Sequence, residues 1–130
     1  MKITLWELNE SYQALVRLAS QSLPKECQAQ AWKLKRVMAG AKREIEDLSD
    51  SINDLMDKCG VVRNDPSNDL AKLEDFNRQS KQFMKSTEVE LWGEPFKWSE
   101  LRDRVSISPL DLADLDWLII EDTEGEGNSE

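Results

Sequence analysis

The longest regular pattern of apolar residues in the chain runs from residue 27 to residue 59. Its members follow alternating steps of four and three without a break: Cys27, Ala31, Leu34, Met38, Ala41, Ile45, Leu48, Ile52, Leu55 and Cys59. Such a repeat places apolar side chains on one helical face, as at the a and d positions of a heptad. No proline interrupts the pattern and Gly60 supplies a stop, so it predicts a helix over residues 24–59, roughly 53 Å long. A helix of that length cannot bury its apolar seam alone and needs partner helices.

Two shorter amphipathic segments flank this long helix. Thr4 and Glu7 match a capping box that opens a helix of about 16 residues. After a turn at residues 64–67, apolar residues recur to about residue 86 and predict a third helix over residues 67–86. Each short helix adjoins one end of the long helix through a short loop, which favours antiparallel packing. We therefore expect each to cover one half of the long helix, with their far ends meeting near its middle.

The chain after the third helix predicts a small β element. Residues 88–91 alternate acidic and apolar side chains, which is typical of a half-buried strand. A turn at 93–95 is expected to return residues 96–98 as a second strand. Residues 2–4 and 105–107 are expected to extend the same sheet.

A short closing helix completes the predicted fold. Ser108 followed by Pro109 predicts a helix start, and the helix is expected to end near Ile120. The fold class is therefore mainly α with a minor β element, in a single domain over residues 1–120. Residues 121–130 contain no apolar side chain and are expected to form a disordered acidic tail.

Composition argues against several kinds of site. The chain is 39% hydrophobic and 33% charged, which is typical of a folded protein. It has no histidine and only two cysteines, Cys27 and Cys59, which we expect far apart on one helix as reduced thiols. We therefore expect a protein that is not an enzyme, with no catalytic residue, no metal and no cofactor. No apolar run is long enough to span a membrane, and no signal peptide is recognisable, so no membrane association is expected.

The net charge of −9 is concentrated near the C-terminus. Eight acidic residues follow Ser108, whereas the last basic residue is Arg104, so residues 1–108 carry a net charge of only −1. Because an acidic terminus repels phosphate, we expect no direct binding of nucleic acid. The tail has three interpretations: it aids solubility, it occupies a basic groove on a target, or it docks on the chain's own basic region around residues 33–43.

Acidic residues also gather at one end of the predicted bundle. In the antiparallel arrangement the third helix places its carboxylates beside those of the long helix, and we expect no neutralisation there. This surface is either an ordinary solvated face or a binding site for a partner with a basic surface. Its candidate residues are Asp50, Asp54, Asp57, Asp69, Glu74 and Asp75.

Five tryptophans are many for a chain of 130 residues. Trp6 and Trp32 are expected in the helical core, and Trp117 on the closing helix. Trp92 and Trp98 flank the predicted turn at 93–95. They either pack the small sheet or contact a partner, because exposed aromatic residues anchor protein interfaces.

The apolar seam of the long helix is compatible with a monomer or an antiparallel homodimer. In the monomer it packs only the two shorter helices. The dimer is favoured by charge, since residues 24–43 carry a net charge of +5 and residues 44–58 a net charge of −5. That register places Cys27 opposite Cys59 of the second copy. The candidate seam residues are Leu34, Met38, Ala41, Ile45, Leu48 and Ile52.

Several segments together resemble a family of small uncharacterised proteins of bacteriophages and prophages. They are the opening MKITLWELNESYQALVRLASQSLP, the long charged helix, the strand in KSTEVELW and the closing SISPLDLADLDWLI. The resemblance spans nearly the whole predicted domain and implies a phage setting, and hence a bacterial cytoplasm. Its motifs mark structural elements and carry no catalytic chemistry.

Together with the absence of catalytic groups, the resemblance favours a binding protein directed at the host. The most concrete expectation is an anti-CRISPR-like inhibitor of an antiviral defence system that blocks a basic surface of its target. The alternative is a virion-assembly accessory or a tail or head chaperone. A small hydrolase using carboxylates is a third interpretation, since aspartate and glutamate are abundant.

Overall fold

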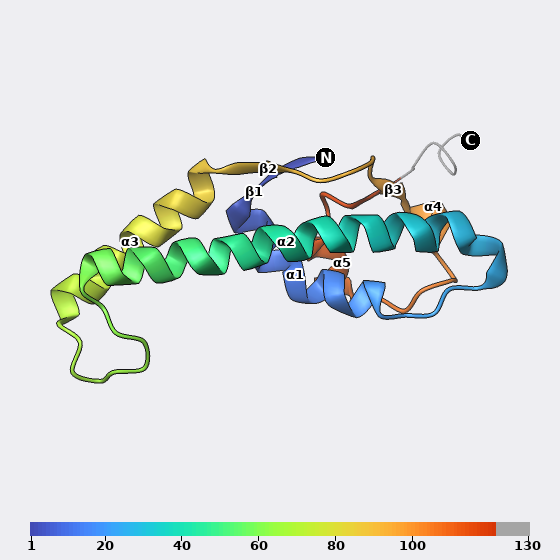
Figure 1. The fold of residues 1–130 in the computed structure, drawn as a ribbon. Helices are drawn as coiled ribbons and strands as arrows, with labels where there is room; N and C mark the ends of the chain where they lie inside the picture. Colours follow the sequence, from blue (N-terminus) through green and yellow to red (C-terminus); the bar gives the residue numbers. More distant parts are fainter. Residues whose placement is uncertain (122–130) are drawn as a thin grey trace.

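The structure is a computed structural model that describes residues 1–121 (Figure 1). It is mainly α-helical with a minor β element, as the sequence predicts. The β element consists of two short pairs of strands. The predicted tail lies outside the described residues, apart from Glu121. The elements are β1 (Lys2–Thr4), α1 (Leu5–Ala19), α2 (Gln28–Cys59), α3 (Leu70–Ser86), β2 (Glu88–Glu90), β3 (Phe96–Lys97), α4 (Trp98–Leu101), α5 (Pro109–Asp114) and β4 (Ile119–Ile120).

The long helix α2 is close to its predicted length. A short 3₁₀ turn at Lys25–Cys27 precedes it, so regular α-helix begins at Gln28. Gly60 ends α2 in the left-handed conformation (φ 72°), and its N–H bonds the carbonyls of Met56 and Asp57. Glycine adopts this conformation without the steric cost that a β-carbon adds.

Helices α1 and α3 each cover one half of α2 and meet near its middle, which confirms the predicted arrangement (Figure 1). The capping box of α1 is present, because Thr4 and Glu7 bond each other's backbone N–H groups. Helix α3 begins at Leu70, later than the predicted residue 67. The reason is local: the Asp69 carboxylate accepts hydrogen bonds from the N–H groups of Ala71 and Lys72 and so caps the helix.

The hydrophobic core lies around the N-terminal half of α2. Helix α1 supplies Leu8, Leu15 and Leu18, α2 supplies Val37 and Ala41, and the chain after β2 supplies Phe96, Leu101, Leu115 and Leu118. Helix α3 has no fully buried residue. The molecule therefore has a well-packed end and, at the far end of α2, a two-helix hairpin that is only partly covered.

Of the predicted strand pairings, the one between residues 2–4 and residues 88–91 is confirmed. Strand β1 pairs antiparallel with β2, with Ile3 opposite Val89. Strand β3 does not join this sheet as expected, because it pairs in parallel with β4 in a second sheet of its own. The predicted strand at 105–107 is also wrong, since no strand forms there.

The closing helix α5 is shorter than predicted and ends at Asp114. Leu115, Leu118 and Ile119 are buried and have helical spacing, which explains the prediction. The chain instead turns so that the Leu118 carbonyl accepts a hydrogen bond from the N–H of Phe96 at 2.7 Å. This pairing satisfies a backbone group beside a fully buried side chain, which a continued helix would leave without a partner.

Two polar contacts attach the C-terminal segment to α1. The Trp117 indole N–H donates to the hydroxyl of the buried Ser11 at 2.9 Å. Arg17 donates two hydrogen bonds to the two carboxylate oxygens of Asp111, at 2.8 and 2.7 Å. Such paired bonds fix the relative orientation of the two helices. Within residues 1–121, no helix is both long enough and apolar enough to cross a membrane.

The Arg17–Asp111 pair predicts a specific dependence of stability on pH. The hydrogen bonds from Arg17 lower the pKa of Asp111, so the pair stabilises the fold above the unfolded pKa and is lost as pH falls through the folded pKa. We expect Arg17→Gln to lower the melting temperature modestly near neutral pH and to have no effect well below about pH 4. Thermal unfolding of wild type and variant across this range measures the difference. The exposed Arg102→Gln is the control, and an Arg17→Gln effect independent of pH would contradict the assignment.

Candidate functional site

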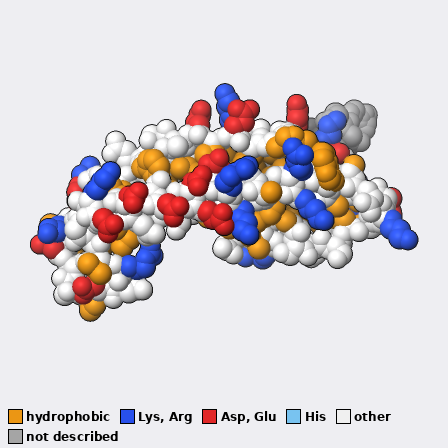
Figure 2. Space-filling view, in the orientation of Figure 1, with side chains coloured by type: hydrophobic (Ala, Val, Ile, Leu, Met, Phe, Trp, Pro, Cys, Tyr) orange, Lys and Arg blue, Asp and Glu red, His pale blue; other side chains and the backbone are white. Residues whose placement is uncertain are grey.

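The solvent-exposed face of α2 carries the main functional candidates. Its side chains recur every three or four residues over nearly the whole helix, opposite the seam that packs α1 and α3. Figure 2 shows basic side chains along the N-terminal half of this face and acidic ones along the C-terminal half. The exposed members are Trp32, Lys35, Arg36, Ala39, Lys42, Arg43, Glu46, Asp47, Asp50, Asp54 and Asp57.

We call Glu46, Asp47, Asp50, Asp54 and Asp57 the acidic surface. All five side chains are exposed and belong to one helix. In the part of the chain that the structure describes, none of them forms an ion pair. Asp50 has Glu46, Asp47 and Asp54 at positions i−4, i−3 and i+4, where side chains on a helix are neighbours. The acidic surface thus holds like charges together without a local counter-charge at Asp50.

Helix α3 does not extend this acidic surface as the sequence suggested. Asp69 is engaged as the cap of α3, and Asp75 pairs with Arg78 and accepts a hydrogen bond from Gln79. Glu74 is exposed. Basic residues also reach this end of the hairpin: Arg63 donates to the Asn53 side chain at 2.7 Å, and the Lys72 side chain lies against Gly60. Arg78 thus neutralises Asp75 within α3, whereas no ion pair among residues 1–121 joins α3 to the carboxylates of α2.

A cluster of two tryptophans and an arginine lies at the other end of α2. We call Trp32, Arg36 and Trp92 the Trp–Arg cluster. The two indole rings meet edge to face with centroids 5.2 Å apart, and the Arg36 guanidinium lies 5.2 Å from the Trp32 ring and 4.9 Å from the Trp92 ring. Trp32 is 54% exposed and Trp92 is 42% exposed. Tryptophan and arginine are the residues that most often contribute binding energy in protein interfaces.

The prediction that Trp32 lies in the core is wrong, and Trp92 and Trp98, which were predicted together, differ in exposure. Trp32 is not in the core, because its position on α2 faces away from α1. Trp92 is exposed, whereas Trp98 is half-buried and packs against the core beside α5. Trp6 is half-buried beneath Lys81 and Lys85 of α3. The strict alternation of the α2 seam, which omits residue 32, is the sequence signal that identifies Trp32 as exposed.

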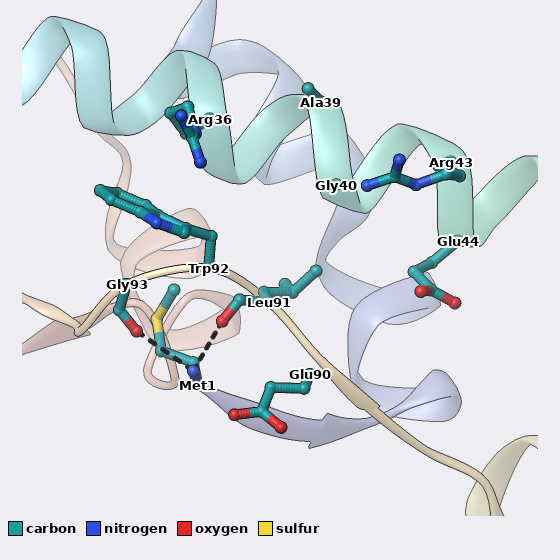
Figure 3. A pocket seen from close by; sticks show the side chains of 10 residues that line it. All are labelled: Met1, Arg36, Ala39, Gly40, Arg43, Glu44, Glu90, Leu91, Trp92 and Gly93. Carbon is teal, nitrogen blue, oxygen red and sulfur yellow. Dashed lines mark hydrogen bonds between the residues drawn. The ribbon is translucent and has the colours of Figure 1, made fainter.

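An open pocket of about 580 Å³ adjoins the Trp–Arg cluster (Figure 3). Gly40 and Leu91 are among the residues that line it, and a β-carbon added at Gly40 would lie 3.6 Å from Cδ2 of Leu91. The amino group of Met1 donates to the carbonyls of Leu91 and Gly93 at 2.7 and 3.1 Å and so fixes one wall. Figure 3 shows Arg36 directed toward Trp92.

The charges around the pocket are mixed. Arg36, Arg43 and Glu44 line it from α2, and Glu90 lines it from β2. Within residues 1–121, no three histidine, cysteine, aspartate or glutamate side chains converge as metal ligands. The geometry suits contact with a polypeptide that presents both charged and apolar groups.

The α2–α3 hairpin presents two further hollows. One is lined by apolar side chains that include Ile52, Met56, Leu73 and Phe76. The other lies beside Phe83, whose side chain is 37% exposed. Two helices alone do not enclose these side chains, and the hairpin therefore leaves apolar area open to a partner.

The candidate dimer seam is used within the chain. Leu34, Ala41 and Leu48 are buried, and Met38, Ile45 and Ile52 are half-buried against the chain's own elements. These side chains therefore pack within the chain, and only Ile52 among the six also lines the open hollow beside Phe76. Cys27 is also buried, at 2% exposure, so a disulfide to Cys59 of a second copy requires opening of the core. The predicted register of an antiparallel dimer stays a prediction.

The contact between Trp32 and Trp92 is testable by a double-mutant cycle. We expect Trp32→Ala and Trp92→Ala to be coupled by about 0.5–1.5 kcal/mol, as measured for aromatic pairs. Chemical denaturation of wild type, both single variants and the double variant gives this coupling energy. Additive effects would contradict the edge-to-face contact. A second cycle of Trp98→Ala with Trp32→Ala serves as the control and should be additive.

Comparisons of this chain with protein-family models, with curated proteins and with solved structures give no match. The resemblance to small phage proteins therefore stays a prediction.

Proposed function

We propose that this protein acts by binding another macromolecule, with the acidic surface of α2 placed on a basic surface of the target. The observation that carries this proposal is the crowding of carboxylates around Asp50. Each like-charged pair at helix spacing costs about 0.2–0.5 kcal/mol, so Asp50 destabilises the free chain by roughly 1 kcal/mol. A basic partner would convert this repulsion into attraction.

The arrangement suits a target that normally holds nucleic acid. Four aspartates at positions 47, 50, 54 and 57 follow one helix face, so their carboxylates repeat along a line. A groove that binds a nucleic-acid strand presents a comparable line of lysine and arginine side chains. Insertion of α2 would block such a groove sterically and electrostatically.

In the phage setting that the resemblance implies, the target would be a complex of a bacterial antiviral defence system. The protein would then be a non-enzymatic, anti-CRISPR-like inhibitor in the bacterial cytoplasm. Because its contacts are exposed charge pairs, the affinity should fall steeply as ionic strength rises. A binding mode based on the Trp–Arg cluster would be less sensitive to salt, since aromatic contacts are not screened.

The second candidate is an accessory of virion assembly. The open apolar hollows beside Phe76 and Phe83 favour it, because a helix of a phage structural protein would cover them and complete a three-helix bundle. In this case the captured partner would be a virion protein, and binding would depend on apolar side chains of the hairpin.

Charge reversal at Asp50 separates a binding role from a structural one. Asp50→Lys replaces three repulsive pairs by attractive ones, so we expect it to stabilise the free protein by about 1–2 kcal/mol. This corresponds to a rise in melting temperature of several degrees. The same substitution should weaken target binding at least tenfold, since it places a cation against a basic surface. Loss of both stability and binding would indicate that Asp50 supports the fold instead.

Affinity capture from infected and uninfected bacterial lysates measures the binding. Wild type, Asp50→Lys and Glu10→Lys are used as baits, where Glu10 is an exposed carboxylate of α1 and its reversal changes net charge equally. We expect wild type and Glu10→Lys to retain a nucleic-acid-binding complex that Asp50→Lys loses, and added DNA should compete with it. Capture of virion proteins alone, unaffected by Asp50→Lys, would reject the inhibitor proposal in favour of assembly.

A further inference from the structure

The hydrogen bonds between β1 and β2 determine which backbone groups of β2 face β1. Two of these bonds flank the paired residues, from the Leu5 N–H to the Thr87 carbonyl at 2.9 Å and from the Leu91 N–H to the Met1 carbonyl at 2.8 Å. Hydrogen-bonded pairs alternate with non-hydrogen-bonded pairs along an antiparallel ladder. The odd-numbered positions 87, 89 and 91 therefore bond β1. The even-numbered residues direct their N–H and carbonyl groups to the opposite edge.

We call Glu88, Glu90 and Trp92 the open edge. Trp92 continues the alternation, because the carbonyl that precedes its N–H accepts a bond from the Met1 amino group on the β1 side. The C=O and N–H of a planar trans peptide point in opposite directions, so the Trp92 N–H lies on the open edge. Within residues 1–121, none of these three N–H groups has a hydrogen-bond acceptor. An unpaired strand edge of this kind is a template for pairing with another strand.

The open edge borders the pocket beside the Trp–Arg cluster. Figure 3 shows the segment from Glu90 to Gly93 between β1 and α2. Glu90 and Trp92 line the pocket from this segment, and Ala39 and Gly40 are among the residues that line it from α2. Small residues on α2 leave space next to the edge, where an added strand would run about 4.8 Å from β2.

We propose that an extended segment of another protein docks on the open edge and adds a third strand beside β2. Main-chain hydrogen bonds to Glu88, Glu90 and Trp92 provide the affinity, and alternate side chains of the segment provide the specificity. The open edge belongs to a different element from the acidic surface of α2. The inference therefore goes beyond the function proposed above and does not depend on it.

The charges of the two strands select a basic segment. Glu88 and Glu90 are exposed on the same face of β2, and neither forms an ion pair within residues 1–121. Lys2 lies opposite Glu90 and is the one cation that β1 and β2 contain. Arg43 and Glu44 line the pocket from α2 and offset each other. Lysine or arginine opposite Glu88 and Glu90 is thus favoured, since opposite charges stabilise cross-strand pairs.

The end of the open edge at Trp92 favours a different side chain. The Arg36 guanidinium lies 4.9 Å from the centroid of the Trp92 ring and would repel a third cation there. The ring itself is 42% exposed, and an apolar side chain would cover it. The expected segment therefore has two basic residues and one apolar residue at alternate positions.

A second copy of this chain fits the open edge poorly. Pairing of two open edges would place Glu88 and Glu90 of one copy beside the same carboxylates of the other. Like charges directly opposite each other destabilise a pair of strands. Charged residues on edge strands commonly prevent such self-association. The charges therefore favour a strand from a different protein.

Selection from a yeast-displayed library of random heptapeptides tests the proposal, with the full-length protein as bait. We expect the enriched peptides to carry lysine or arginine at alternate positions. A synthetic copy is then titrated into wild type, Glu90→Pro and Asp50→Lys. Proline at residue 90 removes an N–H and a carboxylate of the open edge but no bond to β1, so the affinity should fall about tenfold or more. Asp50→Lys changes the acidic surface and should bind the peptide as wild type does.

N-methylation of the peptide tests backbone pairing without any change to the protein. Alternate N–H groups of a strand point to opposite sides, so methylation of one alternate set removes the donors that face β2 and methylation of the other set leaves them. We expect only the first form to lose binding. Equal effects of the two forms, or the enrichment of no peptide, would overturn the proposal.

Two further outcomes would reassign the contact. Loss of peptide binding in Asp50→Lys would overturn the proposal by placing the peptide on the acidic surface. Self-association of wild type that depends on concentration and is abolished by Glu90→Pro would overturn it in favour of a second copy. The lysate captures with Asp50→Lys test the proposed function separately, because that substitution leaves the open edge unchanged.

Discussion

A 32-residue helix with an apolar seam on one side has to be covered by helices of 15 and 17 residues. Neither α1 nor α3 is long enough to cover the whole seam. They lie one after the other along it, on the same side of α2. This constraint leaves most of the opposite side of α2 open to solvent, apart from the place where Trp92 contacts Trp32 and Arg36. The two ends of the molecule therefore differ in how well they are packed, because the chain after β2 packs against α1 and leaves α3 without this additional cover. The candidate binding surfaces described above are therefore mainly surfaces of α2.

The helical part of the fold is readable from sequence because its signals are local. The heptad seam, the Thr4–Glu7 capping box and Gly60 each act through neighbours within one or two turns, and all three are found as predicted. The pairing of β3 with β4 depends on residues 23 positions apart and on a buried backbone N–H at Phe96. The spacing of apolar residues along the sequence indicates neither of these. The spacing of Leu115, Leu118 and Ile119 fits a helix equally well, so sequence alone selects the wrong element there.

Candidate surfaces were harder to predict because exposure depends on what covers each face. The run of aspartates on α2 is visible in the sequence, whereas the local use of Asp69 as a cap and of Asp75 in a pair with Arg78 is not. In the Trp–Arg cluster, Trp32 and Arg36 contact Trp92, which lies 56 positions beyond Arg36 in the sequence. Trp92 reaches them because it belongs to the segment that connects β2 to β3. Opposite charge blocks on one face give α2 two surfaces of opposite charge. The helix dipole does not explain this distribution, since it favours the reverse order of charges.

The polar contact between Ser11 and Trp117 spans 106 positions, and Arg17 and Asp111 are 94 positions apart. The compact end of the molecule is therefore built from both extremities of the chain. During synthesis on the ribosome, α2 is available early to cover one part of the apolar side of α1, whereas the remaining part is covered only once residues 96–119 have been made. A chain that lacks residues 96–119 would therefore leave part of the apolar side of α1 exposed to solvent.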